Sequence, residues 1–123
     1  MRTKKINDDC YEVHLTERES LLASSMIGSS FSGGQHWRVA PESYESKFGI
    51  TYDRANELFE MTRAQRGKHE NQTIRLNRGD GQAIRRIVEH MMHKWDDADF
   101  RTIINADKAE AKEFRDELEK QGF

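Results

Sequence analysis

The residues whose types and spacing most clearly suggest a binding function are the basic side chains between positions 63 and 86. This stretch holds seven basic residues and two acidic ones, Glu70 and Asp80, in a chain whose formal net charge is −2. Guanidinium groups bind carboxylates and phosphates through paired hydrogen bonds. The segment therefore predicts a patch that binds an acidic protein surface or nucleic acid, with an ordinary solvated surface as the alternative. The members of this predicted arginine patch are Arg63, Arg66, Lys68, Arg75, Arg78, Arg85 and Arg86.

Residues 41–66 predict two helices separated by the segment FGIT, in the manner of a helix-turn-helix. In DNA-binding proteins of this kind, the second helix enters the major groove and presents polar side chains to the bases. Here that helix would present Arg54, Asn56 and Arg63. Glu45 stands where such motifs pack a small residue, and acidic side chains share the outer face. An ordinary helical hairpin is therefore the competing interpretation.

The sequence contains only weak indications of a catalytic or metal-binding site. The Gly/Ser-rich segment 28–36 offers serines and His36, but no nucleophile elbow or phosphate-binding glycine motif is present. His90, His93 and Asp97 have a helical spacing that could begin a metal site, although histidines near a helix C-terminus also suit the helix dipole. We therefore expect no enzyme activity, no metal and no cofactor.

Short strands, each followed by a polar helix cap, must position these residues. Alternating apolar residues predict strands over 11–15, 73–77 and 100–105. The predicted caps are Thr16 with Glu19, Asn77 or Asp80, and Asn105 or Asp107. An internal duplication would explain the repeated pattern, but the common requirement for a cap at a strand-to-helix junction explains it as well.

Apolar stripes of helical period follow these caps. We expect Arg85 and Arg86 on the exposed face of the helix that follows the second strand, and we expect the last helix to reach about Lys120. Gly28 is expected to end the first helix and to begin a mobile loop over 28–36. The strongest stripe is formed by Ala83, Ile84, Ile87, Val88, Met91 and Trp95, and the last helix has Ala111, Phe114 and Leu118.

Length and composition indicate one small α+β domain: a short three-stranded sheet, a helix after each strand and an inserted helical hairpin at 41–66. The chain has 123 residues, of which 34% are charged and 35% hydrophobic, so we expect a thin core. Cys10 is the single cysteine, which excludes an intramolecular disulfide and favours the cytoplasm. The first ten residues lack the apolar stretch of a signal peptide, and no apolar run approaches the ~20 residues that cross a membrane.

The sequence therefore predicts a non-catalytic regulatory or inhibitory protein that acts by stoichiometric binding to a macromolecular partner. Such proteins occur among phage and mobile-element accessory proteins. The expected interface is the arginine patch or the acidic C-terminal helix. The alternative is a nucleic-acid-binding regulator that uses the hairpin at 41–66. No motif of a known family is recognisable along the chain.

Overall fold

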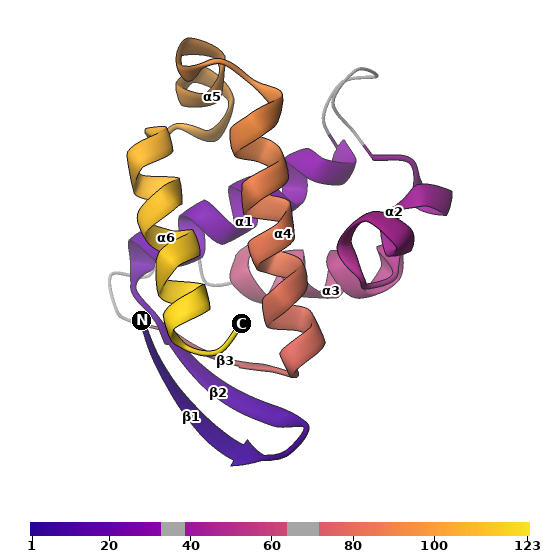
Figure 1. The fold of residues 1–123 in the computed structure, drawn as a ribbon, viewed down its shortest axis with the longest axis vertical. Coiled ribbons are helices and arrows are strands. Elements are labelled where there is room, and N and C mark those ends of the chain that lie inside the picture. The colour runs from indigo at the N-terminus through magenta and orange to yellow at the C-terminus, as the bar shows by residue number, and fades with distance from the viewer. Residues whose placement is uncertain (33–38, 64–71) are drawn as a thin grey trace.

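The computed structural model describes residues 1–32, 39–63 and 72–123, and Figure 1 shows how their elements are arranged. The strands are β1 (Arg2–Asn7), β2 (Cys10–Leu15) and β3 (Gln72–Leu76). The helices are α1 (Glu17–Ser32), α2 (Pro41–Phe48), α3 (Tyr52–Arg63), α4 (Arg78–Lys94), α5 (Asp97–Ile104) and α6 (Lys108–Lys120). This combination confirms the predicted α+β class.

The three strands form one antiparallel sheet with β2 in the middle. Alternation along β2 and β3 buries one face of the sheet, because successive side chains of a strand point to opposite sides. The buried side chains are Tyr11, Val13, Leu15, Ile74 and Leu76. The helices lie to one side of this sheet in Figure 1. The predictions of strands at 11–15 and 73–77 are confirmed to within one residue at either end.

The predicted strand at 100–105 is wrong, because residues 97–104 form helix α5. The carboxylate of Asp96 accepts the backbone N–H of Asp99 at 2.8 Å and so caps this helix. Phe100 and Ile104, four residues apart, are both buried on one helical face. Asn105, with φ of 61°, ends the helix in the left-handed conformation. The helix caps and the buried pair at i and i+4 therefore favour a helix here, more strongly than the short apolar run favours a strand.

The third strand of the sheet is instead the N-terminal β1, which the sequence pattern does not predict. Most of its side chains are exposed, so it lacks the alternation of a half-buried strand. Pairing with β2 defines it, with Thr3 opposite Val13 and Lys4 opposite Glu12. Because β1 leads directly into β2, the expectation of a helix after every strand is also wrong.

Helix α1 does not end at Gly28 but continues to Ser32, so the predicted loop boundary is wrong. Gly28 lies where α1 packs closely on α3, and a Cβ atom there would approach Cε1 of Phe59 to 2.8 Å. The glycine therefore permits close helix packing and does not act as a stop. Of the expected loop 28–36, residues 28–32 belong to α1, and 33–36 lie outside the described residues.

The buried apolar residues form one cluster, to which β2, β3 and every described helix contribute. The predicted stripes of α4 and α6 all point into this cluster. The predicted helical hairpin is confirmed as α2 and α3 over residues 41–63, and Gly49 ends α2 with φ of 85°. Residues 64–66 of the predicted hairpin lie outside the described residues. Arg86 of α4 is exposed as expected, whereas Arg85 is half-buried.

Replacing Ile87 with alanine should lower the free energy of unfolding by about 2–5 kcal/mol, because Ile87 is fully buried and its removal leaves a cavity in the core. The exposed Lys112 of α6 is the control, and Lys112→Ala should stay within about 0.5 kcal/mol of the wild type. Urea denaturation followed by circular dichroism measures both. Equal stability of the two variants would contradict the assigned inner face of α4.

Candidate functional site

The residues of the predicted arginine patch make separate contacts within the fold. Arg78 donates to the hydroxyl of Tyr11 at 2.7 Å and lies over its ring, 5.8 Å from the centroid. Arg85 donates to the backbone carbonyl of Phe123 at 3.0 Å and pairs with Glu89. These two arginines therefore attach β2 and the segment after α6 to α4.

Arg86 donates to the carbonyl of Phe48 at 3.3 Å, at the C-terminal end of α2. A cation there is favourable, because the helix dipole places partial negative charge at that end. Arg63 lies over the ring of Phe59 and pairs with Glu60 at 3.6 Å. Arg75 is exposed on β3, opposite to the buried side chains of that strand. The two remaining members, Arg66 and Lys68, lie outside the described residues.

Arg54, the predicted base-reading residue of α3, makes a bidentate ion pair with Asp80 at 3.0 and 2.7 Å. Asp80 is 1% exposed and also closes a capping box with Asn77 at the start of α4. The hydrogen bond between Arg54 and Asp80 raises the pKa of Arg54 above its usual range, and Glu57 adds to the effect. Arg54 therefore neutralises a buried carboxylate, whereas Asn56 on the same helix is exposed.

Removal of Arg54 should destabilise the protein. Arg54→Ala leaves the Asp80 carboxylate buried without its cation, and breaking such pairs costs about 3–5 kcal/mol. We expect the free energy of unfolding to fall by about 3 kcal/mol, because the Arg54 side chain is 33% exposed and solvent can partly replace it. Arg54→Lys should recover only part of this, since lysine lacks the bidentate geometry.

Asn56→Ala is the matched control on the same helix, and it should be neutral in chemical denaturation. An Arg54→Ala variant as stable as Asn56→Ala would show that the ion pair with Asp80 does not hold α3 on α4.

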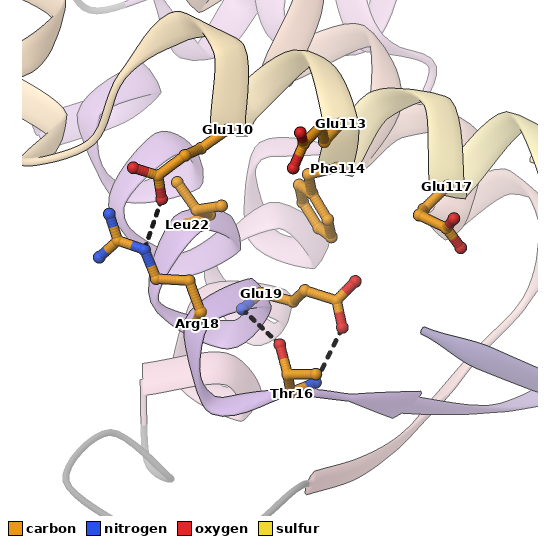
Figure 2. Close-up of a pocket in the computed structure, with 8 residues that line it drawn as sticks. All are labelled: Thr16, Arg18, Glu19, Leu22, Glu110, Glu113, Phe114 and Glu117. Carbon is orange, nitrogen blue, oxygen red and sulfur yellow. Dashed lines mark hydrogen bonds and ion pairs between the residues drawn. The ribbon is translucent and has the colours of Figure 1, made fainter.

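A groove lies between the first turns of α1 and one side of α6, and Figure 2 shows it in close-up. We call it the α1–α6 groove, and its cavity volume is about 180 Å³. Leu22 and Phe114, both buried, form its apolar floor. The residues that line it are Thr16, Arg18, Glu19, Leu22, Glu110, Glu113, Phe114 and Glu117.

Carboxylates surround the apolar floor of the α1–α6 groove. At one end, Arg18 pairs with Glu110 at 2.7 Å, which lowers the pKa of Glu110. Glu19 accepts the backbone N–H of Thr16 at 2.9 Å, so it completes the capping box that the sequence predicts for α1. Glu113 and Glu117 continue along α6, the first exposed and the second half-buried. The groove therefore offers an apolar floor with an acidic border.

The acidic C-terminal helix was one predicted interface, but α1 as its opposite wall was not predicted. The sequence marks Thr16 and Glu19 only as a helix cap. Residues 16–22 and 110–117 lie far apart in the sequence, and the fold alone brings them together.

The histidines of α4 have local roles. Nδ1 of His93 lies 2.7 Å from the carbonyl of Glu89 one turn earlier. His90 packs edge-on against Phe48, with ring centroids 5.5 Å apart. Burial lowers the pKa of His90 to about 4, and Lys47 and Lys94 add to the effect. Within the described ranges, no group of three or more potential ligands could hold a metal ion.

The serines of segment 28–36 include one that is buried. The Ser30 hydroxyl donates to the carbonyl of Ile27 at 2.6 Å and lies 2.8 Å from the hydroxyl of Tyr44. Burial raises the pKa of Tyr44 to about 12. Ser30 therefore joins α1 to α2 in the interior.

The neutral form of His90 should make stability depend on pH. Its pKa falls from an ordinary 6.5 to about 4 on folding, so the unfolded chain binds the proton more tightly. The melting temperature should therefore be highest above about pH 6.5 and fall as the pH drops toward 4. His90→Leu should flatten this slope, and His93→Gln should keep it.

The pH range in which His90 affects stability can be separated from the range in which Glu110 titrates. The pKa of Glu110 lies below its ordinary value of 4.5, so its contribution is lost only at lower pH. Identical slopes for His90→Leu and the wild type between pH 6.5 and 5 would show that His90 does not carry the effect.

Comparisons of the chain with protein-family models, curated proteins and solved structures found no match. No helix in the described part of the chain has the length and apolar character needed to span a membrane. Any assignment of function therefore rests on the residues and their arrangement.

Proposed function

We propose that this chain is a non-catalytic regulatory or inhibitory protein that binds a partner protein stoichiometrically, with the α1–α6 groove as its contact surface. The observation that carries the proposal is the combination of a buried apolar floor, Leu22 and Phe114, with a border of carboxylates. Protein interfaces have this anatomy, with an apolar centre and a polar rim. The free thiol of Cys10 suits a reducing compartment, and we place the binding in the cytoplasm.

The size of the groove favours a protein partner over a small-molecule ligand. Pockets for small molecules usually measure about 300–1,000 Å³. The groove measures about 180 Å³, room for a side chain of a partner and little more. It therefore suits the insertion of one anchoring residue from a larger surface.

Nucleic-acid binding is the second candidate, and the outer face of the sheet favours it. The register places Lys4, Glu12 and Arg75 in one row across the three strands, and Arg2 lies in the next row. Arg2, Lys4 and Arg75 are exposed, so this face carries three cations around one carboxylate. The hairpin at 41–66 is less well suited, because Arg54 is engaged by Asp80.

A capture experiment with two charge-reversal variants separates these functions. The groove variant is Glu113→Lys/Glu117→Lys, and the sheet variant is Arg2→Glu/Lys4→Glu/Arg75→Glu. We expect the wild type to retain a protein in a fixed molar ratio, with or without nuclease. The groove variant should lose this protein, and the sheet variant should keep it.

The opposite pattern would contradict the proposal. Loss of the captured protein from the sheet variant alone would place the contact on the sheet, and capture that disappears with nuclease would favour nucleic acid. Circular dichroism of both variants checks that the reversals leave the fold intact, as surface changes should.

A further inference from the structure

We propose that the occupant of the α1–α6 groove is a short amphipathic helix of the partner, with two basic side chains four residues apart and an apolar side chain between them. This inference rests on the proposed function, because it assumes that the groove is the contact surface. Three features of the groove carry it: a row of carboxylates, an internal ion pair and the apolar floor.

The carboxylates of α6 form a row along the groove. Glu110, Glu113 and Glu117 follow the i, i+3, i+7 spacing that places side chains on one side of a helix. Figure 2 shows them one after another along α6, with Glu110 turned toward Arg18 at the start of α1. An acidic row of this kind is complementary to a basic segment and repels an acidic one.

The fold itself shows how a guanidinium meets this row. Nε of Arg18 donates to Glu110 at 2.7 Å, and Nη2 of Arg18 donates to the carbonyl of Asn105 at 3.3 Å. Within the described residues, Glu113 and Glu117 make no such ion pair. Glu110 is thus paired with an arginine of the chain itself, and Glu113 and Glu117 can accept cations from a partner.

The spacing and the floor define the occupant. Glu113 and Glu117 are one helical turn apart, so basic side chains at i and i+4 of a second helix match them. Leu22 and Phe114 form the floor beside this pair and can accept an apolar side chain. A free metal ion fits less well, because no described cluster of three or more ligands converges.

A synthetic helix tests the inference without knowledge of the partner. The probe is a fluorescein-labelled, alanine-based peptide of about 20 residues, long enough for a helix. It carries Lys at i and i+4 and Leu at i+3, and fluorescence anisotropy measures its binding to the full chain. The groove variant Glu113→Lys/Glu117→Lys should bind at least about a hundredfold more weakly, because each lost close charge pair costs about tenfold or more.

The control is Glu42→Lys/Glu45→Lys, which makes the same change of charge at exposed positions of α2. It should bind the probe like the wild type, and replacing Leu by Ser in the probe should weaken binding to the wild type. Equal weakening by the groove and control variants, or no binding to the wild type, would overturn the inference.

A second copy of the chain is the competing occupant. The β1–β2 hairpin carries Lys5 beside Ile6, a large apolar residue whose side chain is 43% exposed. Self-association in sedimentation that Glu113→Lys/Glu117→Lys abolishes would assign the groove to that copy. If the probe fails but the groove variant loses a captured protein, the proposed function stands and only the helical basic occupant is wrong.

Discussion

The buried carboxylate of Asp80 is the constraint on which the arrangement of the other elements depends. It accepts the backbone N–H of Asn77 at 3.0 Å and so closes the cap of α4 directly after β3. The same carboxylate receives two hydrogen bonds from Arg54 of α3. A charge that is 1% exposed requires a charged partner. The position of α3, and with it the α2–α3 hairpin, is therefore tied to the start of α4.

The arginines of α4 extend this arrangement to neighbouring elements. Arg78 binds Tyr11 of β2, Arg85 binds the carbonyl of Phe123, and Arg86 binds the end of α2. Each guanidinium donates a hydrogen bond to an oxygen of a neighbouring element. Apolar packing alone would leave that oxygen without this hydrogen bond. The density of arginine in this segment thus has a structural use, and reversing these charges would disturb the fold together with any binding.

The floor of the α1–α6 groove, Leu22 and Phe114, belongs to the core, whereas its carboxylate border lies at the surface and can vary without loss of the core. Its end is set by the pair of Arg18 and Glu110, both partly exposed. Glu113 and Glu117 have no comparable structural use among the described residues. The proposed contact surface therefore consists of acidic residues beside a buried floor of Leu22 and Phe114.

Local chemistry in the sequence determined the α+β class, the caps at Thr16 and Asn77, the inward stripes of α4 and α6 and the helical hairpin. These features depend on neighbouring residues, whose spacing is visible in the chain. The tertiary structure alone decided that residues 2–7 form a strand, since β1 is defined by pairing with β2. It also decided that Arg54 pairs with Asp80 and that Glu110 faces Arg18, because these partners are 26 and 92 residues apart. Contacts at such separations depend on how the elements pack, and no local pattern of residues encodes them.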